Sequence, residues 1–323
     1  MIGRGIGPVV FSVALLAAST HAATLPDWAD MGQVAPQATF RAGVEVVTVS
    51  VGVRDNHGRV VQDLKRSDFD VIDSGALIAI KDFYTGESPV SLGLLLDISG
   101  SMAVSGNIDR ARHAVRVALG NLDQGRDEAA FFTFDSKLRE VASFTKDLQW
   151  INALNLEGKP FGTTLLFDAI AETAREVASR ANRQRALLVI TDGVDTASRL
   201  TAPQVSGIAS AIDVPVYLLT VVSPLNHPEG EFSVLSDSET SVGTSTLADL
   251  ARWTGGDMRV SSVPAHTSEA VRDLFMELRH QYLITFEPGA RPGWHPLEVR
   301  TKKKNLIVHA RSGYMSGPGR LTN

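Results

Sequence analysis

The sequence predicts an α/β protein in which a doubly wound, mostly parallel sheet has helices on both faces, together with a small β-sandwich. Residues 89–281 alternate between short apolar runs and segments with apolar residues at helical spacing, the pattern of a buried parallel sheet. Residues 36–88 and 282–316 have strand character instead. Because a few short strands are marginally stable alone, we expect these two flanks to form one sandwich from which the α/β unit emerges as an insertion.

The amino terminus has the features of a secretory signal peptide. Arg4 supplies positive charge, residues 8–18 (PVVFSVALLAA) are apolar, and small residues surround an expected cleavage site after Ala22. The apolar run is shorter than the roughly 18 to 20 residues of a membrane-spanning helix. We therefore expect a signal peptide over 1–22, a linker over 23–35, no transmembrane segment in the mature chain, and export to the periplasm or the cell exterior.

Composition narrows the classes of function. The 323 residues are 44% hydrophobic and 21% charged, which suits a large buried core. A net charge of −5 offers no basic surplus, so we expect no nucleic-acid partner. The chain has no cysteine, which excludes disulfides, thiolate metal sites and cysteine nucleophiles. The sequence does not indicate an oligomeric state.

The strands and helices are expected in the following order. In the first flank, 44–53 alternates, Asn56 to Gly58 marks a turn, and 69–84 contains two strands about a Ser-Gly turn. The parallel strands are LGLLLD (92–97), EAAFFTFD (128–135), ALLVITD (186–192) and VPVYLLTVV (214–222), and helices are predicted over 108–122, 169–178 and 268–280. Strands return over 281–288, 295–301 and 305–314, followed by a tail at 317–323.

Polar side chains follow the predicted parallel strands. Asp97, Ser99 and Ser101 come directly after the first strand, Asp192 follows a later one, and Thr164 precedes a helix in GTTLLFD. Ligands of an open parallel sheet bind where the carboxyl ends of the strands meet. Hydroxyl and carboxylate oxygens are hard donors, so these residues predict a site for a small dication such as Mg²⁺.

The sequence resembles the metal-ion-dependent adhesion site of a von Willebrand factor A (VWA) domain. The resemblance is carried, in this order, by Asp-x-Ser-x-Ser, a Thr before a helix, and Thr-Asp-Gly after a buried strand. The resemblance covers residues 90 to 280, and the flanks are similar to secreted bacterial VWA proteins. It implies a VWA-type fold, and Mg²⁺, or Mn²⁺ or Ca²⁺, held directly by Ser99 and Ser101. Thr164 would bind directly or through water, and Asp97 and Asp192 would hold coordinating waters.

The site residues also have structural interpretations. Asp97 and Asp192 could cap the following turns or helices, and Thr163 or Thr164 could cap the helix expected to begin at Leu165. Thr163 stands where the bacterial pattern has a second glycine. Asp195 we interpret as a solvated loop residue.

Binding is a better interpretation of the sequence than catalysis. The chain lacks a nucleophile elbow, a phosphate loop and a dinucleotide fingerprint, and its eight histidines are scattered. Three neutral hydroxyls would hold the dication, and two carboxylates would bind it only through water. The positive charge of the ion would therefore not be fully compensated. We therefore expect a partner protein to supply an Asp or Glu carboxylate. The alternatives are a structural or assembly module whose metal only stiffens the fold and, remotely, a metal-dependent hydrolase.

The segment 223–245 is long for a loop and carries acids but no Lys or Arg. It is either a solvated excursion or a cover over the open coordination position.

Overall fold

The computed structural model describes residues 46–154, 156, 158–224 and 242–317. The predicted signal peptide (1–22) and linker (23–35), the predicted tail beyond residue 317, and most of the segment 223–245 lie outside the described residues. All described residues belong to one compact unit.

A six-stranded sheet forms the centre of the α/β part, in the order β10-β9-β8-β5-β6-β7. Its strands are β5 (Val90–Asp97), β6 (Glu128–Phe134), β7 (Leu138–Thr145), β8 (Gln184–Thr191), β9 (Val216–Val221) and β10 (Met258–Ser261). All neighbours pair in parallel except β6 and β7, which are antiparallel. The predicted mostly parallel sheet is thus confirmed.

The edge strands β7 and β10 were not predicted. β7 has a single buried residue and contains Arg139 and Glu140, and β10 has four residues that include Arg259. Neither segment therefore shows the apolar run that marks a strand covered on both faces.

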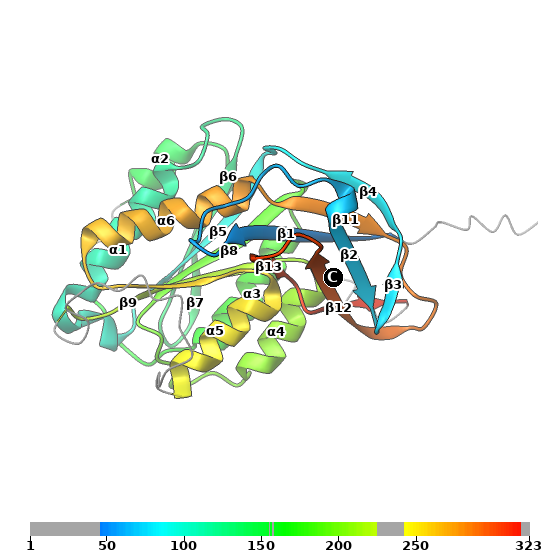
Figure 1. Ribbon diagram of the computed structural model, residues 1–323. Helices are drawn as coiled ribbons and strands as arrows, with labels where there is room; N and C mark the ends of the chain where they lie inside the picture. The colour runs from blue at the N-terminus through cyan, green and yellow to red at the C-terminus, as the bar shows by residue number, and fades with distance from the viewer. Residues whose placement is uncertain (1–45, 155, 157, 225–241, 318–323) are drawn as a thin grey trace, which may run out of the picture. The chain divides into compact units, whose positions relative to one another are not determined.

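Helices cover both faces of this sheet, as Figure 1 shows. They are α1 (Asn107–Gly120), α2 (Leu148–Asn152), α3 (Leu166–Ala178), α4 (Ala202–Ala211), α5 (Val242–Thr254) and α6 (Pro264–Arg279), with short 3-10 turns η1 (Arg66–Asp68) and η2 (Gly100–Gly106). Leu94 and Leu96 of β5 pack with α1 and α6, whereas Leu95 packs with α3, α4 and α5. Successive side chains of β5 point to opposite faces of the sheet, so the strand contributes to a separate hydrophobic core on each face.

Three of these helices, α2, α4 and α5, lie outside the predicted helical ranges. α4 begins with a capping box between Thr201 and Gln204, a sequence signal that periodicity alone does not capture. α5 begins at Val242, so the last residues of the predicted loop 223–245 are helical.

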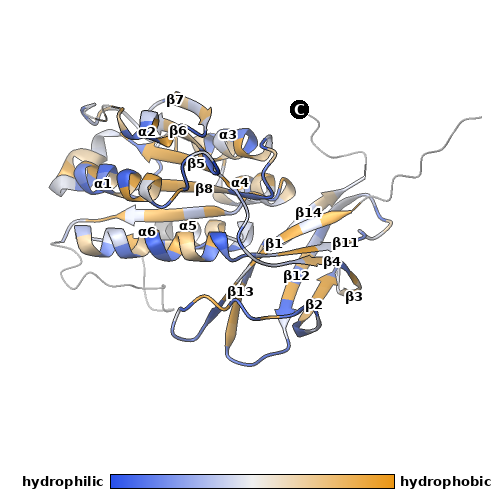
Figure 2. Ribbon diagram, turned by 90° about the horizontal axis from the view of Figure 1, so that it is seen from above, coloured by the Kyte–Doolittle hydropathy of each residue, from blue (hydrophilic) through white to orange (hydrophobic). Residues whose placement is uncertain are grey.

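Two four-stranded sheets combine the two flanks of the chain, in the orders β13-β1-β11-β4 and β14-β12-β2-β3. Their strands are β1 (Val47–Asp55), β2 (Phe69–Asp73), β3 (Ala76–Ile78), β4 (Ile80–Tyr84), β11 (Tyr282–Phe286), β12 (Gly293–Thr301), β13 (Leu306–Ala310) and β14 (Gly313–Ser316). Both sheets contribute to one hydrophobic core. The composite sandwich predicted from the two flanks is therefore present, and Figure 2 shows its strands beside one another.

Two strand predictions in the flanks were wrong in number. Residues 69–84 form three strands, because the chain turns at Ser74 and then leaves β3 for the other sheet as β4. Residues 305–314 likewise divide into β13 and the start of β14, which belong to different sheets. Strands that change sheet at the corner of a sandwich continue the same sequence pattern, so the pattern does not reveal the break.

No helix within the described residues is both long and apolar enough to cross a membrane.

Candidate metal centre

Asp97 lies at the carboxyl end of β5, near the middle of the central sheet, and its side chain is fully buried. The backbone N–H of Ser99 donates to Asp97 Oδ1 at 2.8 Å, and the Thr191 hydroxyl donates to Oδ2 at 2.6 Å. Burial raises the pKa of the Asp97 carboxyl to about 6, and the charge of Asp192 also raises it. A cation at this position would favour the ionised form.

The two serines present their hydroxyls side by side. Ser99 Oγ and Ser101 Oγ are 3.1 Å apart, with Ser99 buried and Ser101 half-buried. Adjacent oxygen ligands at right angles on an ion with bonds of ~2.0 to 2.1 Å are separated by about 2.9 Å. The spacing of the hydroxyls therefore fits two ligands of a small octahedral dication.

The loop that carries Thr164 lies against the loop that carries the serines. Gly100 N–H donates to Gly162 O at 3.1 Å, and Phe161 N–H donates to Ile98 O at 3.0 Å. Gly162 has a φ of +91°, in the left-handed region that favours glycine. Two residues later the same loop reaches Thr164, which is buried.

Thr164 does not cap the following helix, so that alternative interpretation is wrong. Asp195 Oδ1 accepts from the Leu166 N–H at 2.9 Å, and Ser198 Oγ accepts from the Phe167 N–H at 3.0 Å. The interpretation of Asp195 as a solvated loop residue is also wrong, since it is half-buried and caps α3. Thr164 N–H donates instead to the Thr196 hydroxyl at 2.9 Å, which joins the second loop to the third.

Asp192 follows β8 on this third loop and is half-buried. Its Oδ1 accepts from the Val194 N–H at 3.3 Å, so Asp192, like Asp97, also holds its own turn. The adjacent Thr191 was missed by sequence reasoning, although a hydroxyl at the last position of a buried strand was the available signal. Thr191 connects the β8 end to Asp97 and so fixes the two carboxylates at one edge of the sheet.

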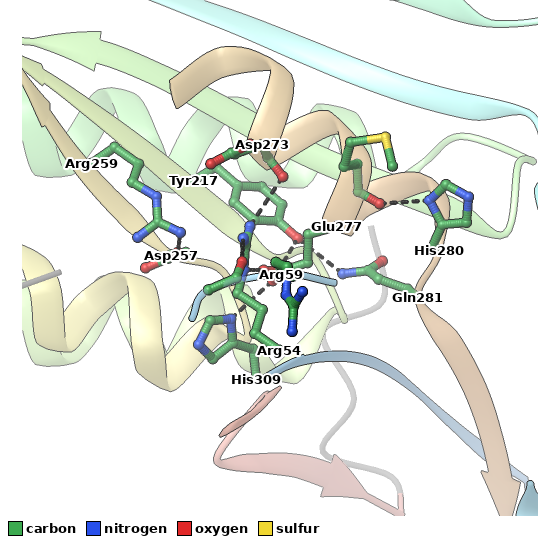
Figure 3. Close-up of polar contacts among 12 residues, drawn as sticks. Arg54, Arg59, Tyr217, Asp257, Arg259, Asp273, Glu277, His280, Gln281 and His309 are labelled. Atoms are coloured by element: carbon green, nitrogen blue, oxygen red, sulfur yellow. Dashed lines mark hydrogen bonds and ion pairs between the residues drawn. The ribbon is translucent and has the colours of Figure 1, made fainter. Parts of the chain in front are cut away.

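A second polar cluster lies elsewhere in the molecule. Oxygen or nitrogen atoms of Asp257, Glu277 and His309 lie within 4.8 Å of one another, close enough for a metal site. Figure 3 shows this cluster with Arg54, which pairs with Glu277, and Arg259, which pairs with Asp257 at 2.8 Å. Two guanidiniums thus balance two carboxylates without an added ion, and we interpret the cluster as an ion-pair network.

The charges in this cluster change how its members titrate. Burial opposes the ionisation of Glu277, but the charges of His309 and Arg54 lower the pKa of its carboxyl to about 2. His309 Nδ1 lies 2.9 Å from Glu277 Oε1. Burial disfavours the charged imidazole, yet the Glu277 carboxylate raises the pKa of His309 overall.

Comparison with known proteins found one matching family model and a set of similar solved structures. Residues 92–194 match the von Willebrand factor type A domain. No curated protein is similar enough to this chain to count as a match.

The solved structures matched include an aerotolerance-related membrane protein from Bacteroides fragilis, with 18% identity over 58% of this chain and 98% of that chain, and a TM-score of 0.45. BatB, a conserved hypothetical protein from Bacteroides thetaiotaomicron, has 20% identity over 57% of this chain and 96% of that chain, with a TM-score of 0.42. A von Willebrand factor type A structure from Catenulispora acidiphila has 12% identity over 86% of this chain and 76% of that chain, with a TM-score of 0.45.

The match over 92–194 includes the strands and loops that carry Asp97, Ser99, Ser101, Thr164 and Asp192. Those strands lie in a mostly parallel sheet covered by helices on both faces. The chain therefore contains a von Willebrand factor type A domain.

Proposed function

We propose that this chain is an exported, metal-ion-dependent binding protein whose VWA domain captures an Asp or Glu carboxylate of a partner protein. One observation carries the proposal: Asp97 is buried at the carboxyl end of β5 and accepts from the Ser99 N–H, and the hydroxyls of Ser99 and Ser101 lie 3.1 Å apart in the loop that follows. Asp192 and the loop of Thr164 adjoin this point. Export is part of the same proposal and is based on the signal-like residues 1–22.

The donor set suits a divalent ion with one position left for an anion. Ser99, Ser101 and Thr164 would hold Mg²⁺, or Mn²⁺ or Ca²⁺, while Asp97 and Asp192 would orient its waters. A bound ion would supply the electrophilic position that attracts the partner's carboxylate. Because the protein ligands that would touch the ion are neutral hydroxyls, an incoming carboxylate adds charge compensation that the site lacks.

Binding, and not catalysis, is the role that we propose for these residues. Both oxygens of Asp97 already accept hydrogen bonds, from Ser99 N–H and the Thr191 hydroxyl. The carboxylate is therefore held as a fixed acceptor, whereas a general base must be able to reach a substrate proton.

Thermal unfolding with and without Mg²⁺ tests the metal site. A ligand at 100 times its Kd stabilises the native state by about 2.7 kcal/mol, which for a chain of this size corresponds to a rise in Tm of roughly 4 to 5 °C. We expect this rise in the wild type and in Asp109→Asn, an exposed acid on α1, but not in Asp97→Asn or Ser99→Ala. Equal rises in all four proteins would refute the site.

A second measurement separates binding from a purely structural role. The full chain, immobilised, is exposed to envelope extract in Mg²⁺ and in chelator. Capture that depends on Mg²⁺ and is lost in Ser99→Ala supports the proposal. Capture that persists in chelator supports the structural or assembly module instead.

A further inference from the structure

We infer that the candidate metal centre selects an acidic protein segment whose carboxylate is flanked by bulky apolar side chains. This inference rests on the proposed function, because it concerns the partner of the same site. The observation behind it is an apolar rim, defined as Val104, Phe161 and Val194. These side chains are 59%, 81% and 49% exposed.

Each rim residue comes from a different loop of the centre. Val104 lies three residues after Ser101, Phe161 three residues before Thr164, and Val194 two residues after Asp192. The three loops are joined by backbone hydrogen bonds, so the rim residues are carried by one connected surface. Single exposed apolar side chains are ordinary, but several around one polar site indicate an interaction surface.

Phe161 is the most exposed large apolar side chain among the described residues. Its backbone is nevertheless fixed, because its N–H donates to Ile98 O at 3.0 Å. A partner that covers this ring gains hydrophobic free energy without first having to order the backbone that carries it.

Charges near Phe161 favour an acidic partner over a basic one. Lys159 is exposed and lies two residues before the ring. Lys137 is also exposed and follows Ser136, whose Oγ lies 3.7 Å from the position a Cβ would take at Gly162. The nearest acid on that strand end, Asp135, is compensated by Arg139 at 2.8 Å.

The test compares two capped peptides of equal charge, one with a glutamate between two leucines and one with the glutamate between two serines. Binding of each to the full chain in Mg²⁺ is measured by NMR titration. Partial burial of leucine against the rim should make the first peptide bind about three to ten times more tightly. In Phe161→Ser this preference should fall below about twofold, while Leu77→Ser, an exposed residue of β3 in the sandwich, should keep it.

The possible results separate this inference from the proposed function. Equal affinity for both peptides, each Mg²⁺-dependent, overturns the apolar rim and leaves the metal-dependent function standing. A leucine preference that survives in chelator supports the rim and refutes metal dependence. Failure of both peptides to bind overturns both. If the wild type is a dimer by sedimentation and Phe161→Ser is a monomer, the rim is covered by a second copy of the chain and the acidic-segment inference is wrong.

Discussion

Replacing Glu277 with glutamine should destabilise the protein more than any surface change on the same helix. Glu277 lies on α6 of the α/β part and is fully buried. Its carboxylate pairs with Arg54 of β1 and with His309 of β13, both in the sandwich. Figure 3 shows these partners converging on it. The substitution keeps the shape of the side chain but removes its charge.

The expected loss is about 3 to 5 kcal/mol, the usual cost of removing one partner of a buried ion pair. Arg54 is only 3% exposed, so its guanidinium would stay buried without a counterion. Its other acceptors, Gly58 O at 2.7 Å and Asp273 O at 3.0 Å, are neutral carbonyls that do not replace the lost charge. Replacing both members of the pair, as in Arg54→Met with Glu277→Met, should therefore cost less than Glu277→Gln alone.

Urea unfolding followed by tryptophan fluorescence measures this loss as a shift in midpoint. Glu269→Gln is the matched control, because Glu269 lies on the same helix but is exposed. The control should change stability by less than ~0.5 kcal/mol. If Glu277→Gln falls within ~1 kcal/mol of the control, the ion-pair network does not stabilise the junction of α6 with the sandwich.

Three further predictions concern this junction and the sandwich beside it. The pKa of His309 is raised in the folded state, so the stability that His309 contributes is present below its ordinary pKa of 6.5 and is lost as the pH rises through its folded pKa. The pKa of Glu277 is lowered to about 2, so the stability that Glu277 contributes is present above its ordinary pKa of 4.5 and is lost as the pH falls towards about 2. Urea midpoints at pH 6 and 9 should differ less in His309→Gln than in the wild type, and an unchanged difference would exclude His309 as the titrating group. Gly52→Ala should cost about 1 to 3 kcal/mol in urea unfolding, because its Cβ would lie 2.7 Å from Glu277 Oε1; a neutral effect would mean that strand β1 and Glu277 can separate. Truncation after Gln281 removes β11, which pairs with both β1 and β4. Limited proteolysis of the truncated protein should therefore cut within residues 47–84. Continued resistance of this segment to proteolysis would show that the first flank folds independently.

Much of the fold could be predicted from local sequence patterns. The apolar run ending at Asp97 predicts a strand buried on both faces, and the spacing of Val271, Leu274 and Leu278 predicts a helix with one buried side. The residues of the candidate metal centre were predicted from the same kind of local pattern. They sit at fixed offsets from strand ends or a helix start, where parallel topology brings them to one edge.

The structure decided how those residues are held. Asp195 and Ser198 cap α3, which leaves Thr164 free of that task, and Thr191 binds Asp97 from the neighbouring strand. These contacts depend on how three loops pack against one another. A hydroxyl or a carboxylate in a loop has many possible partners, and the sequence around it does not say which one is near.

The ion-pair network shows the same limit over longer distances. Arg54, Glu277 and His309 come from three segments far apart in the chain, and each one alone resembles an ordinary charged or polar residue of an amphipathic strand or helix. Periodicity indicates which side of an element is buried, because that depends on the element's own geometry. Which charge meets which in the interior depends on the packing of whole elements, since a buried charge is tolerated only where tertiary structure delivers its partner.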